Sequence, residues 1–528
     1  MAHILGALGL QTLITTQMSQ NWRYRSVLLP AGPSSEAWPT GTCRAACSML
    51  DLFDAGAIQQ LDVLEVAPRV DRDLREPRAV PVEARLAVQH QVVGPPLAVR
   101  DNAVTQLANL VGALPASAQA RRQNRARPLR SVLAAASARR LRKDDMDPLI
   151  DRREYAGLAN CTYLNQASLG LMPRVSLEAS TRFLTDIAQY GNLRLSDQAE
   201  AEILDSLRAA AAELLGAPVV SVAVVGGASE GLGQLAALLS GPDGEVILVP
   251  SDFPSVTYPW LAAHERSGMR IRWVPDVAAK DLTQSLVDAI SERTTVVCVS
   301  AVQFSTGTHV DVAALVARAR SAGARVVVDV TQMAGAVPVT MSAWGADALV
   351  CSGYKWLSAP GGVALLAVTE DLAAVTPPLI GWKGSAEPFD FKPQELSLAA
   401  DARRFELSTM SYSAASGLLA SIKLLTGIGL NSIREHADRL ADSLVKRVAP
   451  LGWTPYRPLG DRSASGHIVS LRHPTAAVEE VQAALVDEHR IITSSRVGGI
   501  RVSLHVYNSG DDVRALSEAL ESIGRHKN

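Results

Sequence analysis

Residues 326–356 read VVVDVTQMAGAVPVTMSAWGADALVCSGYKW, and this stretch decides the fold class that the sequence predicts. It begins with the β-branched run Val326 to Val328, which is typical of a buried strand and ends on Asp329. A second apolar run, 348–351, ends shortly before Lys355. Ligands of open α/β sheets bind outside the carboxyl ends of the strands. We therefore expect the Asp329 carboxylate and the Lys355 amine to face one site.

An acid and a lysine at one sheet edge suit one kind of chemistry. A lysine forms a Schiff base with a carbonyl cofactor such as pyridoxal phosphate, and a carboxylate opposite keeps the pyridine nitrogen protonated. Each residue also has an ordinary structural explanation. Asp329 could cap a helix that begins near Thr331, and Lys355 could be a surface residue. These two residues alone leave both explanations open.

The composition bounds the classes of function. The chain has 528 residues, of which 48% are hydrophobic and 20% charged, which suits a globular protein with a large core. A formal net charge of -2 argues against general nucleic-acid binding. The 5 cysteines are scattered without metal-ligand spacing, so we expect no metal and a reducing compartment, the cytoplasm. No window supplies the ~20 apolar residues of a membrane span, so we expect no membrane association.

Residues 1–145 differ from the rest of the chain. They mix short apolar pieces with proline-containing turns and end in the arginine-rich run ARRQNRARPLRSVLAAASARRLRKDD. We favour a weakly ordered extension, or a start codon placed upstream of a true start at Met146. A targeting segment, or a basic arm that docks on an acidic partner, is the functional alternative. We assign no chemistry to this part.

From residue 146 onward, strands alternate with helices, which predicts a mainly parallel sheet with right-handed crossovers. Besides the two runs described above, the pattern predicts strands at 221–225, 245–249 and 295–300, and helices at 198–215, from about 230, at 312–322 and at 413–426. After Gly429 the pattern restarts, with strands at 467–471 and 500–505 and helices at 477–489 and from 511. We therefore expect a large domain over 146–428 and a small α/β domain over 429–528.

Two further strand ends carry candidate ligand-binding residues. The sequence Gly226-Gly227-Ala228-Ser229 separates a strand from a helix, whose first N–H groups are free to bind a phosphate. Its glycine spacing matches neither the dinucleotide fingerprint nor the P-loop, so it is a weak signal alone. Phe253 follows the next strand, where its ring could stack on a flat cofactor or simply pack in the core.

With these pieces in order, the chain from about residue 163 to its end resembles the class V aminotransferase family of pyridoxal-phosphate enzymes. That family includes cysteine desulfurases, kynureninases and isopenicillin N epimerases. The motifs that carry the resemblance are VVVDVTQ, SGYKW, RRFELST and GGIRVSLHVYNS. The resemblance implies the α/β fold of type I pyridoxal-phosphate transferases, with a mainly parallel seven-stranded sheet and a smaller C-terminal α/β domain. It also implies the cofactor pyridoxal 5'-phosphate and an α-amino-acid substrate.

The resemblance gives roles to individual residues. Lys355 matches the Schiff-base lysine, Asp329 the partner of the pyridine nitrogen, and Gln332 the donor to the ring hydroxyl. The remaining cofactor positions are the phosphate ligands Ala228, Ser229 and Ser352 and the ring-stacking residue Phe253.

The resemblance also implies how a substrate and a second subunit meet the site. Arg501 matches the arginine that grips the substrate α-carboxylate, a task that suits a bidentate fork. Asn165 and Gln303 occupy positions of polar residues that contact substrate or cofactor. Thr409 matches a residue that reaches the phosphate of the neighbouring subunit, which implies a homodimer.

One departure from the family bears on the reaction. Cysteine desulfurases carry a catalytic cysteine on the loop before the matched arginine, whereas residues 491–499 read IITSSRVGG. Many of them also have a histidine where this chain has Phe253. Because persulfide chemistry needs a thiolate, we expect an enzyme other than a desulfurase. We favour an aminotransferase, with an amino-acid epimerase or a C–S or C–C β-lyase as alternatives. A non-catalytic cofactor-binding regulator is a further alternative, against which the lack of a recognisable DNA-binding motif argues.

Overall fold

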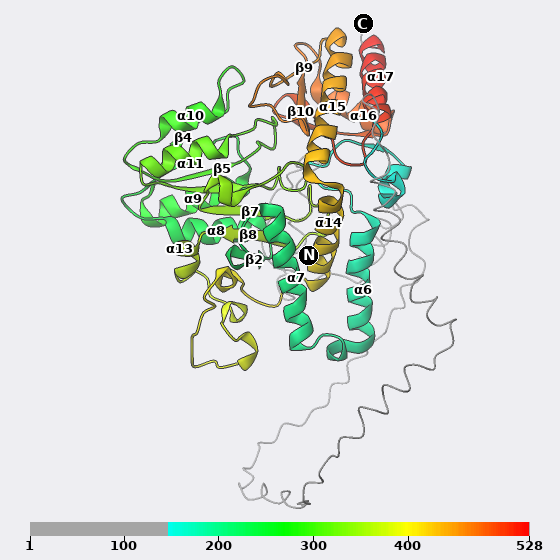
Figure 1. Cartoon of the computed structure of the whole chain (residues 1–528). Coiled ribbons are helices and arrows are strands. Elements are labelled where there is room, and N and C mark those ends of the chain that lie inside the picture. Colours follow the sequence, from blue (N-terminus) through cyan, green and yellow to red (C-terminus); the bar gives the residue numbers. More distant parts are fainter. Residues whose placement is uncertain (1–145, 527–528) are drawn as a thin grey trace, which may run out of the picture. The chain divides into compact units, whose positions relative to one another are not determined.

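The computed structural model describes residues 146–526 (Figure 1). The predictions for residues 1–145 lie outside the described residues. The main sheet has seven strands in the order β2-β8-β7-β6-β5-β3-β4. These strands are β2 (Val222–Val225), β3 (Glu245–Leu248), β4 (Arg270–Trp273), β5 (Thr294–Ser300), β6 (Arg325–Asp329), β7 (Ala348–Ser352) and β8 (Ala364–Val368). Only β8 runs antiparallel to its neighbours in this sheet, so the predicted α/β fold with a mainly parallel seven-stranded sheet is confirmed.

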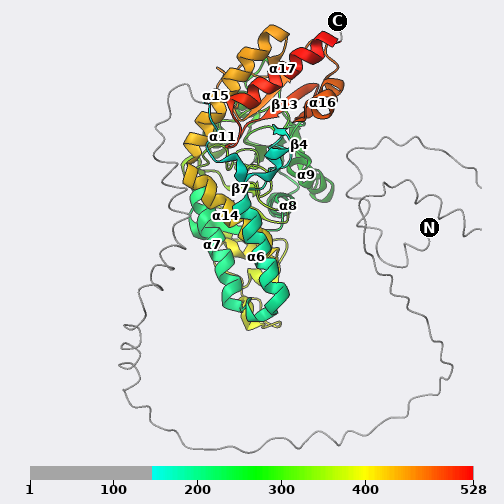
Figure 2. The same cartoon turned by 90° about the vertical axis from the view of Figure 1, so that its right-hand side faces the viewer.

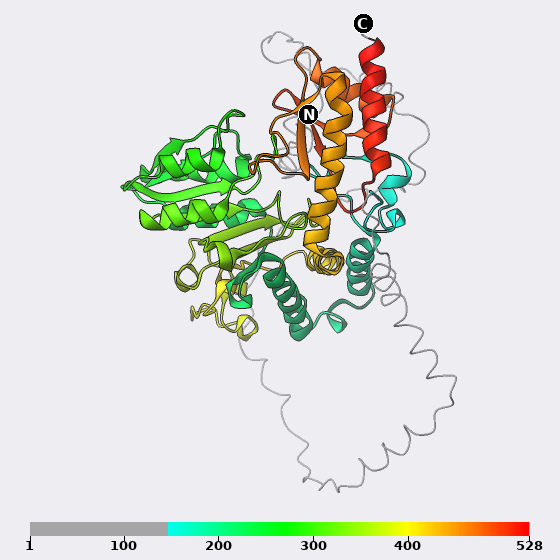
Figure 3. The same ribbon diagram turned by 45° about the horizontal axis from the view of Figure 1, so that its top comes forward.

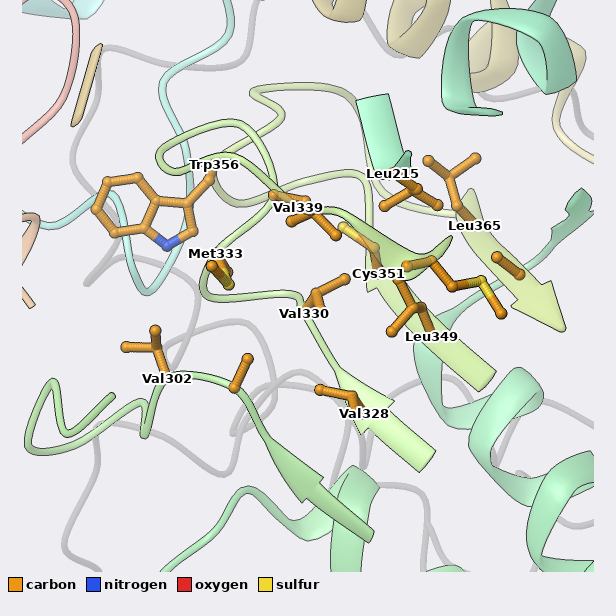
Figure 4. Packing of buried hydrophobic residues seen from close by; sticks show 14 of the residues in the cluster. Leu215, Val302, Val328, Val330, Met333, Val339, Leu349, Cys351, Trp356 and Leu365 are labelled. Atoms are coloured by element: carbon orange, nitrogen blue, oxygen red, sulfur yellow. The ribbon is translucent and has the colours of Figure 1, made fainter. Parts of the chain in front are cut away.

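Alternate residues of the central strands enter two separate cores. In β6, Val326 and Val328 belong to one hydrophobic cluster and Val327 to the other. Figure 4 shows the first cluster, with Val328 and Val330 beneath the segment that carries Trp356. A strand that is buried on both faces has no need of polar residues along its length. The continuous apolar run of β6 therefore follows from its central place in the sheet.

The helices that cover the main sheet begin at side-chain caps in several cases. Ser196, Asp281 and Asp311 accept N–H groups at the starts of α7, α10 and α11. The helices are α6 (Arg174–Tyr190), α7 (Asp197–Leu215), α8 (Ala228–Leu239), α9 (Pro254–Ser267), α10 (Leu282–Ala289), α11 (Val312–Ser321) and α14 (Tyr412–Ile428). Helices α6, α7 and α14 run beside one another (Figure 2).

A smaller antiparallel sheet lies in the C-terminal part, in the order β12-β13-β10-β9. Its strands are β9 (Thr454–Pro455), β10 (Ile468–Arg472), β12 (Ser494–Arg496) and β13 (Gly499–Ser503). Helices α15 (Leu430–Val448), α16 (Val478–Asp487) and α17 (Gly510–His526) pack against Val469, Leu471, Ile500 and Val502 on one face (Figure 3). The other face of β10 and β13 carries Ser470, Arg501 and Ser503 together with Ile468.

The two parts meet at a break in one helical run. Helix α14 ends at Ile428, and Gly429, with φ 95°, separates it from α15. The predicted boundary at residue 429 falls at this break, and the division into domains stays a prediction. Within residues 146–526, no single helix is long and apolar enough to cross a membrane. The two consecutive helices Tyr412–Ile428 and Leu430–Leu451 are bent by 74° at the break between them. Taken together they have the length and composition of a membrane span, and no other observation supports one.

Some elements differ from the sequence-based expectations. Strand β8 follows Gly361 and Gly362 and was not expected, because the glycines obscured the short apolar run behind them. The sequence predicts a helix from Pro173 through Phe183, whereas α6 runs on to Tyr190 and ends where Gly191 adopts φ 51°. Residues 331–336 form turns, so the helix considered near Thr331 does not exist.

A buried ion pair ties α7 to the main sheet. Arg208 Nη1 lies 2.7 Å from Glu406 Oε1, and the two side chains are 7% and 3% exposed. The same carboxylate accepts the backbone N–H of Val224 in β2 at 2.9 Å. Burial raises the pKa of Glu406, while the charge of Arg208 opposes that shift. The pair therefore fixes the segment that leads to Thr409.

Replacing Arg208 by methionine should destabilise the fold by about 3–5 kcal/mol, because it strands a buried carboxylate without its partner. Urea unfolding at neutral pH measures this loss. The matched control is Arg514→Met, which removes an exposed arginine paired with Asp511 and should change the stability little. Equal losses in both variants would contradict the role given to the buried pair.

Candidate active site

Three parallel strands deliver polar residues to one edge of the main sheet. Ser300 ends β5, Asp329 ends β6 and Ser352 ends β7, and the register pairs Ser300 with Asp329 directly. All three residues are buried. The expected meeting point at the carboxyl ends of the strands therefore exists in the structure.

Asp329 is a buried carboxylate that belongs to no helix cap. Its Oδ1 accepts the N–H of Thr331 at 3.0 Å, and its Oδ2 accepts the Ser300 hydroxyl at 3.3 Å. Burial raises the pKa of Asp329, and the hydrogen bonds from Thr331 and the charge of Lys355 oppose this. Because residues 331–336 form turns, a capping role does not explain the acid.

Lys355 is not a surface lysine, since only 6% of it is exposed. Its Nζ lies 4.8 Å from the centre of the Phe253 ring. Burial lowers the pKa of Lys355 to about 8, and the nearby Asp329 carboxylate opposes that shift. Within residues 146–526 no direct ion pair joins the two residues, although each influences the charge of the other. The two charges are therefore near each other without forming an ion pair.

The backbone around Lys355 rests on the N-terminal segment of the described chain. Gln166 Nε2 donates to the Lys355 carbonyl at 2.9 Å, and Gly170 N–H donates to the Tyr354 carbonyl at 2.9 Å. A Cβ added to Gly170 would lie 2.1 Å from the Lys355 carbonyl oxygen. Only glycine therefore allows this approach.

Gln332 is held by residues on both sides of its amide. Its Nε2 donates to the Ala167 carbonyl at 3.1 Å, and its Oε1 accepts the Trp356 indole N–H at 2.8 Å. The backbone carbonyl of Gln332 lies 2.7 Å from His467 Nε2, and burial lowers the pKa of that histidine to about 4. Within residues 146–526 the Ala167 carbonyl is the acceptor of the Gln332 amide group, which leaves its second hydrogen without an acceptor there.

The starts of helices α8 and α9 lie together, and Phe253 immediately precedes α9. The hydroxyls of Ser229, in the first turn of α8, and Ser255, in the first turn of α9, are 2.7 Å apart. Ser229 is exposed, and the preceding Ala228 is buried. The N-termini of both helices carry partial positive charge and free N–H groups, which suit a phosphate.

Arg501 is a buried cation held by neutral groups. Its Nη1 donates to the Phe304 carbonyl at 2.7 Å, and its Nη2 donates to Asn165 Oδ1 at 3.1 Å and to the Ser168 hydroxyl. The residue is 1% exposed, and burial lowers its pKa to about 9. No acid in the described part of the chain forms an ion pair with it, and its Nε has no partner there. A buried charge without a counter-ion is costly, so this site suits an anionic ligand.

Asp252 is a site residue that the sequence analysis missed. It accepts hydrogen bonds from the Phe253 N–H, from the Ser300 N–H and hydroxyl, and from Gln303 Nε2, at 2.6–3.2 Å. Burial raises its pKa to about 6, with a contribution from Asp329. The Ser300 hydroxyl thus links two buried carboxylates. No local signal marked it, because Asp252 lies beyond the end of β3 at Leu248 and its partner Ser300 is 48 positions away.

Gln303 and Thr409 lie outside the group of residues around Lys355, each for a different reason. Gln303 is fully buried, its amide nitrogen is taken by Asp252, and its Oε1 has no partner in the described residues. Thr409 is exposed on the loop after Phe405. The single chain therefore brings together Asp329, Lys355, Phe253 and Arg501 but leaves Thr409 outside that group.

Comparison with known proteins gives a consistent family. The family described as Aminotransferase class-V matches residues 162–516. Kynureninase of Deinococcus radiodurans is 31% identical over 362 residues, covering 65% of this chain and 85% of that protein. The uncharacterized aminotransferase YcbU of Bacillus subtilis is 28% identical, covering 60% and 82%. A probable cysteine desulfurase of Streptomyces coelicolor is 28% identical, covering 72% and 96%.

Solved structures share the fold. The cystine C-S lyase C-DES in complex with cysteine persulfide has a TM-score of 0.64 at 24% identity, covering 69% of this chain and 98% of that one. The cysteine desulfurase CsdA of Escherichia coli has a TM-score of 0.62 at 21% identity, covering 70% and 96%. At these identities the likeness supports the fold.

The Gly170→Ala variant should lose about 1–3 kcal/mol of stability, because the new methyl group would overlap the Lys355 carbonyl. Hydrogen exchange should also become faster in residues 354–358. The control is Gly233→Ala within α8, where no atom lies within 4 Å of the added Cβ. That change should be neutral or stabilising by about 0.5–1 kcal/mol. An unaltered exchange rate in residues 354–358 would speak against this close approach.

Proposed function

Because the chain belongs to the aminotransferase class-V family, whose members use pyridoxal phosphate, we propose that it is an aminotransferase acting on an α-amino acid. The observation that carries the proposal is the pair of buried charges at one sheet edge. The Lys355 amine and the Asp329 carboxylate influence each other's pKa, and the face of Phe253 lies 4.8 Å from that amine.

The residues on this edge fit the cofactor. Lys355 would bond to the aldehyde, Asp329 would hold the pyridine nitrogen, and Phe253 would stack on the ring. The ring hydroxyl would meet Gln332, and the phosphate would meet the α8 start at Ala228 and Ser229 together with Ser352. The bound cofactor supplies an electron sink for the pair released at the substrate α-carbon.

Lys355 is suited to proton transfer near neutral pH. With a pKa of about 8, its amine is partly neutral at that pH, whereas an ordinary lysine remains charged. A neutral amine is both a nucleophile and a base. Asp329 provides the negative charge that keeps a cation favourable in the same buried space.

Arg501 would bind the substrate α-carboxylate, with Asn165 and Ser168 fixing the guanidinium plane. Its planar fork offers two parallel donors to a carboxylate. The positive charge of Arg501 also lowers the pKa of Lys355. Gln303 would not contact the substrate directly but would position Asp252 through its hydrogen bond to that carboxylate.

We further propose a homodimer in which Thr409 serves the neighbouring subunit. Thr409 is exposed, and a nearby loop exposes large apolar side chains: Leu379, Ile380, Trp382, Phe391 and Leu396. Such a concentration of apolar surface is typical of an interface. Free thiols at Cys161, Cys298 and Cys351 support a cytoplasmic location.

The exclusion of desulfurase activity is part of this proposal. Residues 491–499 contain no cysteine, and Cys298 and Cys351 are fully buried in strands. Cys161 is half-buried, and burial raises the pKa of its thiol, which disfavours the reactive thiolate. Epimerisation and C–S or C–C β-lysis remain alternatives that the same site residues would serve, and the kynureninase relative favours the lyase among them.

The reaction is tested with a panel of amino acids on the cofactor-loaded protein. Transamination should give a keto acid without stoichiometric ammonia and should require an amino acceptor. Ammonia with a keto acid would indicate C–S β-lysis, and alanine with a carboxylic acid from the side chain would indicate hydrolytic C–C β-lysis. A D-amino acid would indicate epimerisation, and alanine with sulfide from cysteine would indicate a desulfurase. Arg501→Gln should lower kcat/KM by at least about tenfold through loss of the carboxylate contact. A cofactor-binding protein without any turnover would contradict the enzyme and favour a regulator.

The pH dependence of cofactor uptake tests the state of Lys355. The buried amine loses its proton as pH rises through about 8, so uptake by the apoprotein should accelerate up to that pH and then level off. Asp329 raises the pKa of Lys355, so Asp329→Asn should move the plateau to lower pH. Stopped-flow absorbance measures both rates, with the exposed-lysine variant Lys423→Ala as control. A midpoint near that of an ordinary lysine would refute the assigned environment.

A further inference from the structure

The hairpin that ends in Arg501 places a second arginine on the same face of the small sheet. Strands β12 and β13 are joined by Val497 and Gly498, both with positive φ (48° and 69°), a two-residue turn that fits the twist of a hairpin. The register pairs Ser494 with Arg501 and Arg496 with Gly499. Directly opposed residues in an antiparallel pair share a face, as do residues two apart in one strand. Arg496 is therefore a diagonal neighbour of Arg501.

A third arginine borders the same face from β10. The register pairs Ser470 with Arg501, and a Cβ added to Gly499 would lie 3.5 Å from Arg472 Cγ. Arg472 and Arg496 thus flank Gly499, which has no side chain to separate them. The intervening residue Ile500 points into the core on the other side of the sheet.

The arginines of this face have no acidic partner within residues 146–526. Arg472 stacks on Tyr456 at 4.3 Å and donates to the Val497 carbonyl at 3.2 Å, while its buried Nε has no hydrogen-bond partner in the described residues. Arg496 is half-buried and donates to the Ser495 carbonyl at 2.7 Å. Glu479 reaches the hairpin only through Ser495, whose side chain points to the opposite face. Arg496 therefore offers donors that the described residues do not use.

Unpartnered polar atoms mark the space between these arginines as a binding site. The Ser494 hydroxyl, on a residue that is 7% exposed, has no hydrogen-bond partner in the described chain, and neither has Arg501 Nε. These residues lie directly opposite each other. Buried polar groups are rarely left unpaired without a ligand or water to meet them.

Resting on the proposed function, we propose that Arg496 binds a second anionic group on the substrate side chain, so that the enzyme prefers a dicarboxylic α-amino acid. Arg501 takes the α-carboxylate, and Arg496, nearer the exposed turn, takes the distal carboxylate. Diagonal neighbours in a sheet lie about 7–8 Å apart at their backbones, a spacing that two arginine side chains can close around aspartate or glutamate. Two bound carboxylates would also relieve the repulsion between the arginines, which lowers the pKa of Arg501 in the empty face.

Unreactive acids test the binding step on the cofactor-loaded enzyme. Calorimetric titration should show glutarate binding at least about tenfold more tightly than butyrate. Arg496→Gln should remove that preference by weakening glutarate alone, and Arg496→Lys should retain part of it. The control Arg514→Gln changes an exposed arginine of the same domain and should leave both affinities unaltered. Equal weakening of glutarate and butyrate by Arg496→Gln, or no preference in the native enzyme, would overturn the proposal.

Turnover separates this inference from the proposed function. The ratio of kcat/KM for glutamate over glutamine, or aspartate over asparagine, should fall at least about tenfold in Arg496→Gln. An enzyme that takes up the cofactor and converts neutral amino acids, yet discriminates against dicarboxylic ones, would refute the inference alone. A protein that takes up no cofactor through Lys355 would refute the proposed function itself.

Discussion

The site depends on two opposite charges that are buried together and kept from direct contact. Asp329 and Lys355 each lie at 6% exposure, and each moves the pKa of the other. Had the side chains formed a tight ion pair, they would have satisfied each other and left no reason to bind a ligand. The parallel strands β6 and β7 set their spacing, and the hydrogen bonds of Gln166 and Gly170 to residues 354–355 fix the lysine turn. The sheet therefore holds two buried opposite charges that do not form an ion pair with each other.

Arg501 carries another buried charge that has no ion-pair partner in the described residues. Its neutral partners Asn165 and Ser168 come from the start of the described chain, whereas Arg501 comes from near its end. The two sites of unmet charge thus face a common region from different parts of the fold. An α-amino acid, which carries an amine and a carboxylate on one carbon, matches this pairing of groups. A ligand of this class would supply the opposite charges that these buried groups do not find within the described residues.

The sequence predicted the sheet and the strand-end residues well, because both follow from local patterns. The run at Val326–Val328 with its terminal Asp329 is visible without any structure, since a strand buried on both faces is continuously apolar. Gln166 and Asp252 could not be found in this way. Their roles come from partners 48 or more residues away, Ser300 for Asp252 and Lys355 for Gln166, and no local period encodes such contacts. The place of Arg496 beside Arg501 likewise follows only from the register of the hairpin.

The pairing of β1 (Thr162–Tyr163) with β11 (Ile491–Ile492) has a consequence for how the protein is made. These two-residue strands join segments from opposite ends of the described chain, as do the contacts of Arg501 with Asn165, 336 positions apart. Contacts over such sequence separations carry a large loop-closure cost and form late in folding. The contact of Arg501 with Asn165 therefore forms only when the last part of the described chain has left the ribosome. A nascent chain that already contains the complete main sheet still lacks this buried arginine and the strand that carries it.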